Sequence, residues 1–128
     1  KVEALAQEVL DTSMLRKATH NVHAAALADQ EKVLVFREDI GRYNAIDKVA
    51  GLVLAKKMPT EDKVLFTSGR LASGMVFKAA RLGVSAIVCC SAVTALALDL
   101  AGKAGMTIIG NAGNDKPWLY TGRQNIRE

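Results

Sequence analysis

The sequence predicts an α/β protein, a three-layer α/β/α sandwich around a mostly parallel β-sheet. Apolar runs of strand length alternate along the chain with segments of helical periodicity, and this alternation is typical of right-handed βαβ units. Half of the 128 residues are hydrophobic, whereas aromatic residues make up only 5%. Such a composition favours packed layers of Ala, Val, Leu and Ile. The length fits one domain and no linker is visible, so we expect residues 1–128 to form a single domain.

The first part of the chain is predicted to form a helix, a hairpin and a second helix. Apolar residues at helical spacing predict an amphipathic helix over residues 2–15. The stretches HAAALAD (23–29) and KVLVFRE (32–38) are typical of two strands joined by a short polar turn, which favours a hairpin. A second apolar face of helical period starts at Asn44, and this helix is predicted to end before Pro59.

Strands and helices continue to alternate in the second part of the chain. Three continuous apolar runs predict strands buried on both faces, namely KVLFTSG (63–69), VSAIVCC (84–90) and MTIIGNAG (106–113). The segments between them have helical periodicity, and each ends in a glycine suited to a C-terminal cap, Gly83 and Gly105. Residues 114–128 show no clear period, so no element is predicted there.

Charge and composition argue against nucleic acid and membranes as partners. The net charge is +4, and the 17 Lys and Arg residues are dispersed along the chain without a basic run. The apolar runs are far shorter than the roughly 20 residues of a membrane-spanning helix, and no signal-peptide pattern is present. We therefore expect a cytoplasmic protein. The chain does not begin with Met, which we interpret as a trimmed or partial sequence.

Polar residues cluster where four predicted strands end. The clusters are Arg37, Glu38, Asp39 and Arg42; Thr67, Ser68, Gly69 and Arg70; Ser91 and Thr94; and Asn111, Gly113 and Asn114. Ligands of open α/β sheets bind beyond the carboxyl ends of the strands, because helix N-termini present free N–H groups there. Arg42 and Arg70 suit a phosphate, since a guanidinium offers paired donors in a planar fork. The alternative is a set of solvated loops and ordinary helix caps, and no P-loop or GxGxxG motif decides between the two.

Histidine and cysteine residues give weaker signals. His20 and His23 are three residues apart, so in a strand they would point to opposite faces and would not share a metal. We expect no metal site and a hydrogen-bonded, structural role for His23. Cys89 and Cys90 are adjacent, which excludes a disulfide framework. Cys90, nearest the strand end, is the thiol best placed to react, although buried strand cysteines usually behave as small hydrophobic residues.

Four blocks of the sequence match one known family in order and spacing: REDIGRYNAIDK (37–48), SGRLASGMV (68–76), SAVTALALDLAGKAGMTIIG (91–110) and LYTG (119–122). Through these blocks the chain resembles the FdhD/NarQ family of formate dehydrogenase accessory proteins. The resemblance extends from about Thr19 to Thr121. It implies a cytidine deaminase-like α/β/α fold, a homodimer and a cytoplasmic sulfurtransferase as the full-length protein.

The same resemblance implies a cofactor and two protein partners. Family members take sulfur from a cysteine desulfurase and pass it to the molybdenum cofactor, the bis-molybdopterin guanine dinucleotide form, for the catalytic subunit of formate dehydrogenase. The sulfur is carried on a cysteine of a CxxC loop that would precede residues 2–15, so this chain is expected to be the cofactor-binding part. The cofactor-binding residues that the family motifs imply are Arg37, Asp39, Arg42, Asn44, Asp47, Ser68, Gly69, Arg70, Asn111, Ala112, Gly113, Asn114, Asp115 and Lys116.

The chain departs from the family pattern near its C-terminus and lacks deaminase chemistry. Asn111 and Gly113 stand where Phe and Arg are usual, which removes one phosphate partner, and Lys116 supplies part of that charge. A zinc deaminase needs a Glu two residues after its first ligand and a later PCxxC pair, and neither accompanies His23. Two other functions stay open from the residues alone. One is a non-catalytic scaffold that docks formate dehydrogenase, and the other is thiol chemistry at Cys90.

Overall fold

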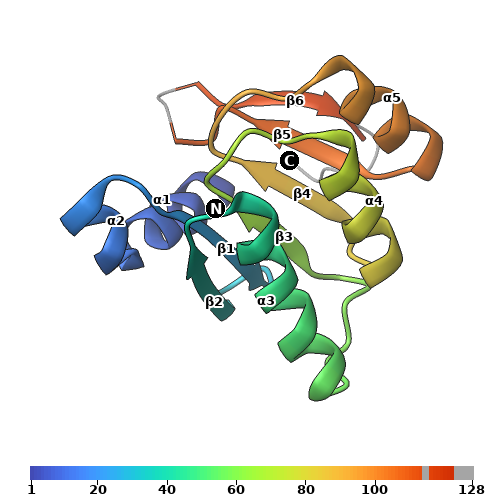
Figure 1. Cartoon of the computed structure of the whole chain (residues 1–128). Coiled ribbons are helices and arrows are strands. Elements are labelled where there is room, and N and C mark those ends of the chain that lie inside the picture. Colours follow the sequence, from blue (N-terminus) through green and yellow to red (C-terminus); the bar gives the residue numbers. More distant parts are fainter. Residues whose placement is uncertain (114–115, 123–128) are drawn as a thin grey trace.

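A mixed six-stranded sheet forms the centre of the computed structural model, which describes residues 1–113 and 116–122 (Figure 1). The strand order is β2-β1-β3-β4-β5-β6. In chain order the elements are α1 (Val2–Thr12), α2 (Met14–Thr19), β1 (His23–Ala28), β2 (Val33–Asp39), α3 (Arg42–Ala55), β3 (Val64–Thr67), α4 (Ser73–Leu82), β4 (Ala86–Cys89), α5 (Ala95–Ala104), β5 (Thr107–Gly110) and β6 (Trp118–Thr121). The predicted α/β class is confirmed, as is the hairpin of β1 and β2.

Four of the described strands run in one direction. β3, β4 and β5 pair in parallel, β1 is antiparallel to both β2 and β3, and β6 is antiparallel to β5. Parallel pairing is therefore limited to the three central strands, because the hairpin turn reverses the chain between β1 and β2. The directions of β2, β3, β4 and β5 nevertheless agree, so their carboxyl ends meet at one edge of the sheet. We call this the carboxyl edge.

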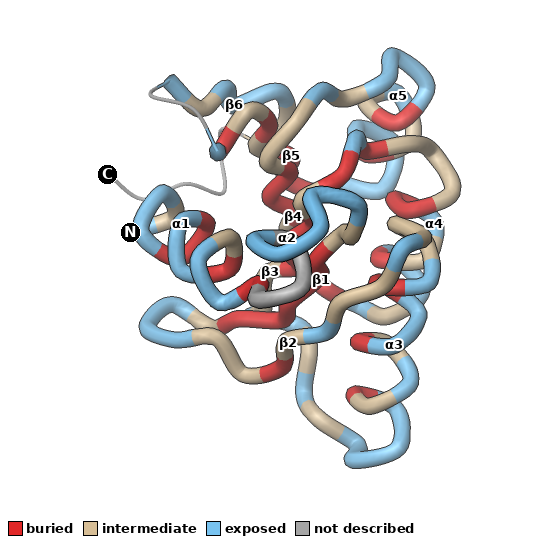
Figure 2. The backbone as a smooth tube through the Cα atoms, turned by 60° about the vertical axis from the view of Figure 1, so that its left-hand side comes forward, coloured by how far each residue is buried: buried red, intermediate tan, exposed pale blue. Residues whose placement is uncertain are grey.

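Helices cover both faces of the sheet, as predicted for three layers (Figure 2). Side chains alternate along β1: Ala25 and Leu27 join the core beneath α3 and α4, whereas Ala24 and Ala26 join the core beneath α1. Five of the six residues of β1 are fully buried. Because alanine is small, α1 and α3 can both approach this strand closely. The alanine-rich sequence is thus suited to a strand enclosed between two helices.

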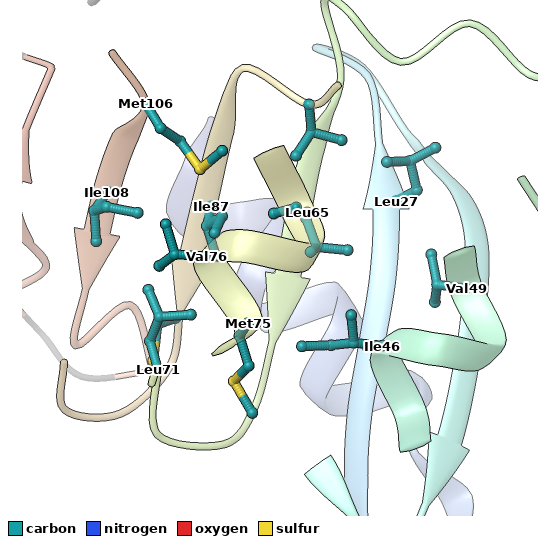
Figure 3. Packing of buried hydrophobic residues seen from close by; sticks show 14 of the residues in the cluster. Leu27, Ile46, Val49, Leu65, Leu71, Met75, Val76, Ile87, Met106 and Ile108 are labelled. Carbon is teal, nitrogen blue, oxygen red and sulfur yellow. The ribbon is translucent and has the colours of Figure 1, made fainter. Parts of the chain in front are cut away.

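The larger core lies between the sheet and helices α3, α4 and α5. Figure 3 shows Met75 and Val76 of α4 packed over Leu65 and Ile87, which belong to the neighbouring strands β3 and β4. The smaller core on the other face centres on Phe66, which is fully buried. Burial of such a side chain stabilises the folded state by about 1.5–3 kcal/mol. The two cores fix the sheet and hold the strand ends in place.

The C-terminal ends of α4 and α5 lie at the two glycines that the sequence predicts as caps. Gly83 and Gly105 end α4 and α5 in the left-handed conformation, with φ of 87° and 68°. A residue with a side chain is strained there, so both glycines act as the predicted C-terminal caps. No helix in the described part of the chain is long and apolar enough to cross a bilayer.

The structure differs from the sequence prediction at both ends of the chain. The helix predicted over residues 2–15 stops at Thr12, because Ser13 leaves the helical conformation and is buried, with its hydroxyl donating to Glu38. A second helix, α2, then begins at Met14. Residues 114–128 contain the unpredicted strand β6, which pairs with β5. β6 has no buried residue and no continuous apolar run of the kind that predicts β3, β4 and β5, so its pairing with β5 rather than the local sequence defines it.

Candidate functional site

The loops at the carboxyl edge are joined to one another by backbone hydrogen bonds. The N–H of Leu71, after β3, donates to the carbonyl of Ala92, after β4, at 2.9 Å. The N–H of Asn111, after β5, donates to the carbonyl of Ser91 at 3.1 Å. The polar clusters that follow β3, β4 and β5 therefore form one continuous rim. Since strands lie about 4.8 Å apart, the rim spans roughly 10 Å from β3 to β5.

Arg42 lies beside this rim, and its guanidinium pairs with none of the residues that the structure describes. It is the first residue of α3, and its Nε atom is buried without a hydrogen-bond partner among the described residues. The described carboxylates form no salt bridge with it, and its one aromatic contact is Tyr43, 5.7 Å from the ring centroid. A buried donor without a partner costs free energy. An anion at this position would remove that cost.

Gly69 brings the β3 loop into close contact with Arg42 and His23. A Cβ at Gly69 would lie 3.1 Å from the Arg42 Cβ and 3.1 Å from the His23 Nδ1. No side chain fits this position without displacing a neighbour, so the backbone itself approaches Arg42. The preceding Ser68 exchanges two hydrogen bonds with Ala24, which fix the loop to β1.

Arg70 and two helix N-termini add positive potential to the same edge. The Arg70 side chain is exposed and makes no hydrogen bond or ion pair with any residue that the structure describes. α3 begins after Gly41 and α4 after Ala72, and neither helix has a side-chain cap. Their first N–H groups lack an intrahelical partner, and the helix dipole favours an anion there. The edge is therefore electrostatically suited to phosphate groups.

Other predicted site residues have partners within the protein. Asp39 accepts from the Gly41 N–H at 2.9 Å and pairs with Lys48 at 2.8 Å, and the Lys48 ammonium followed by the Gly41 N–H lowers the pKa of Asp39 to about 2. Asn44 lies 3.4 Å from Asp39. Asp39 thus fixes the turn from β2 into α3.

Asp47 and Arg37 also have local partners. Asp47 pairs with Lys78 at 2.6 Å and so links α3 to α4. The Arg37 Nη1 donates to the carbonyl of the preceding residue, Phe36, at 2.6 Å, and its side chain is exposed. Each of these two side chains is therefore held by a partner other than Arg42.

The predicted C-terminal segment lies at the β5 end of the rim. Asn111 has a positive φ of 59°, and the buried Ala112 donates its N–H to the carbonyl of Cys89. A Cβ on the exposed Gly113 would lie 3.3 Å from the carbonyl oxygen of Cys90. Lys116 is exposed, and Asn114 and Asp115 lie outside the described residues.

One polar contact at the rim is not predicted by the sequence. The strand pattern predicts Cys89 to be a small hydrophobic residue, yet its thiol donates to the carbonyl of Gly69 at 2.9 Å. Burial raises the pKa of the Cys89 thiol, which keeps it protonated and able to donate. The sequence carries no signal for this contact, because residues 69 and 89 are joined only by the pairing of β3 with β4.

A groove of about 800 Å³ lies at the opposite edge of the sheet, between the amino ends of the strands. It is lined by residues that include Asp62, Gly83 and Gly105. The C-terminal ends of α4 and α5 and a carboxylate disfavour an anion there. The groove contains none of the predicted site residues, so the carboxyl edge remains the candidate site.

The fold and this edge define a class of α/β sandwich proteins with a cationic rim at the carboxyl ends of the strands. Residues 1–127 match the FdhD/NarQ family, and the chain belongs to it. A protein of Bacillus subtilis named sulfur carrier protein FdhD is 42% identical over 125 residues, which cover 98% of this chain and 48% of that relative. The protein of the same name from Bacillus pumilus is 41% identical over 124 residues, covering 97% and 47%.

A solved structure agrees with this assignment. The crystal structure of a formate dehydrogenase accessory protein from Desulfotalea psychrophila superposes with a TM-score of 0.90 at 32% identity, covering 98% of this chain and 57% of that chain. The chain therefore spans about half the length of the curated relatives that it matches.

Proposed function

We propose that the carboxyl edge binds the diphosphate of a guanine dinucleotide, as part of a protein that transfers sulfur to the molybdenum cofactor of formate dehydrogenase. The observation that supports this most directly is the buried Nε of Arg42, which has no partner among the described residues. A diphosphate is the ligand that a guanidinium fork and uncapped helix N-termini complement.

Three groups would hold the diphosphate. The Arg42 guanidinium and the Arg70 side chain supply charge, and the first turn of α4 supplies backbone N–H groups. Gly69 keeps the loop after β3 close to Arg42, since a Cβ there would crowd Arg42 and His23. When bound, the molybdenum cofactor supplies the metal centre that receives sulfur. The task of these residues is to bind and orient it.

The relatives' names support the wider role. They are called sulfur carrier proteins, and the solved neighbour is called a formate dehydrogenase accessory protein. From the family resemblance we further propose that a cysteine desulfurase supplies the sulfur, that the catalytic subunit of formate dehydrogenase receives the cofactor, and that the protein acts in the cytoplasm as a homodimer.

Calorimetric titration with guanosine diphosphate tests the binding proposal. We expect saturable binding that pyrophosphate competes away. Arg42→Ala should weaken the Kd about 10- to 150-fold, which corresponds to about 1.5–3 kcal/mol for a charged hydrogen bond. Arg81→Ala is the matched control, because Arg81 lies in the last turn of α4, stacked on Phe77. No binding, or equal binding by Arg42→Ala, would exclude this site.

A scaffold that docks formate dehydrogenase is the alternative, and a competition experiment separates the two. Immobilised protein would be incubated with formate dehydrogenase in the presence and absence of guanosine diphosphate. If the edge binds a nucleotide cofactor, the diphosphate should change the amount of dehydrogenase retained, and Arg42→Ala should abolish that change. Retention that does not respond to the diphosphate favours the scaffold.

A further inference from the structure

The thiol of Cys89 occupies the junction between two loops of the rim. It is fully buried at the end of β4, and three backbone carbonyl oxygens surround its sulfur: Gly69 at 2.9 Å, Ser91 at 3.3 Å and Ala92 at 3.6 Å. The thiol has one proton to donate, and the shortest of these contacts is to Gly69. The Ser91 N–H in turn approaches the sulfur at 3.4 Å.

This hydrogen bond determines the direction of the following peptide group. The described chain contains no cis peptide bond, so the C=O of Gly69 and the N–H of Arg70 point in opposite directions. Because the Gly69 carbonyl points to a buried sulfur, the Arg70 N–H points away from the core. That N–H makes no hydrogen bond to any residue in the described ranges. It is therefore available to a ligand, next to the close contact of Gly69 with Arg42.

We propose that Cys89 is a positioning residue of the anion site: its thiol holds the Gly69 carbonyl toward the core and thereby presents the Arg70 N–H to the bound diphosphate. This inference rests on the proposed function, and it adds a donor that the side chains alone do not supply. Without the thiol, the Gly69–Arg70 peptide can rotate, and the ligand has to restrain it on binding. The free energy needed to order this peptide group on binding lowers the affinity for the ligand.

Three variants of the purified protein test the positioning role by titration with guanosine diphosphate. Cys89→Ala removes the donor and should weaken the Kd about threefold to tenfold, the range of one neutral hydrogen bond. Cys89→Ser keeps a donor in the same place and should restore affinity to within about twofold of the wild type. Ile87→Val is the matched control, because it removes a methylene group from the same face of β4 without touching the rim. It should lower the melting temperature and leave the Kd unchanged.

The outcomes separate this inference from the proposed function. If the wild type binds and Cys89→Ala binds equally well, or if Cys89→Ser is as weak as Cys89→Ala, the positioning role is wrong while the site stands. If the wild type does not bind, both fail. The infrared S–H stretching band gives a measurement independent of folding defects in the variants. A band shifted to the frequency of a hydrogen-bonded thiol, retained in Cys90→Ala, supports the contact, whereas bands of free thiols only would overturn it.

Discussion

Gly69 lies so close to Arg42 that a side chain on Gly69 would have to displace the Arg42 side chain. A Cβ on Gly69 would lie 3.1 Å from the Cβ of Arg42 and 3.3 Å from its Cδ. Gly69 belongs to the loop after β3, whereas Arg42 is the first residue of α3, which follows β2. Their contact brings the backbone of the β3 loop against the aliphatic stem of Arg42 at the carboxyl edge.

Gly69→Ala should therefore weaken the binding of guanosine diphosphate while the protein stays folded. The added methyl group displaces the Arg42 side chain, and we expect the Kd for guanosine diphosphate to rise about tenfold or more, as for a misplaced charged hydrogen bond. Gly51→Ala is the control, because Gly51 lies in the middle of α3 and nothing lies within 4 Å of a Cβ there. It should stabilise the protein by about 0.5–1 kcal/mol and leave the Kd unchanged. Equal affinities for both variants would contradict the contact.

Arg42→Lys tests whether the planar fork of the guanidinium matters. Lysine keeps the charge but donates from a single flexible ammonium group, so it cannot form two parallel hydrogen bonds to a phosphate. We expect an affinity between those of the wild type and Arg42→Ala, measured by calorimetry at one salt concentration. If lysine retained the full affinity, a point charge would suffice and the bidentate geometry would be wrong.

Asp39 should make the stability of the protein depend on pH in acid. The pKa of Asp39 is lowered from 3.8 to about 2 by Lys48 and the Gly41 N–H. A depressed carboxyl pKa contributes stability that is complete above the unfolded-state pKa and is lost as the pH falls toward 2. Urea unfolding between about pH 4 and pH 2 should show a steeper loss of stability in the wild type than in Asp39→Asn. Parallel curves for the two proteins would show that the turn does not depend on this ion pair.

Ala26→Val should show how tightly β1 is enclosed. Ala26 is fully buried in the core beneath α1. Protein cores are close-packed, so we expect the two added methyl groups to overpack this site. Overpacking of this kind costs about 1–3 kcal/mol. Chemical denaturation would measure the loss, which we expect despite the higher strand propensity of valine. An unchanged or increased stability would mean that α1 packs loosely on β1.

Much of the fold follows from local patterns in the sequence. The strands and helices of residues 23–110 lie close to their predicted positions, because the strands are apolar runs, the helices have a helical period, and Gly83 and Gly105 mark helix ends. Ser13 and β6 were not predictable in this way. The break at Ser13 depends on Glu38, 25 residues away, and β6 is defined by its pairing with β5. Both depend on tertiary contacts.

The candidate site could be predicted only in outline. The carboxyl edge follows from strand directions, and Arg42, Gly69 and Arg70 follow from the motifs. The sequence did not show that Asp39 and Asp47 would be paired with lysines, because Lys48 and Lys78 become partners only when α3 is folded onto its neighbours. The thiol contact of Cys89 was hidden for the same reason. Where carboxylates and arginines are close in sequence, the sequence alone therefore does not tell which side chain binds a ligand and which forms an internal ion pair.

The missing side-chain caps of α3 and α4 have a thermodynamic consequence. An anion bound at the edge would accept hydrogen bonds from the first N–H groups of both helices. It would thereby stabilise these helices as an N-cap serine side chain does in other helices. By mass action, the melting temperature would then rise with ligand concentration. Amide hydrogen exchange at the start of these two helices would slow in step with occupancy, which makes those amides natural reporters of cofactor loading.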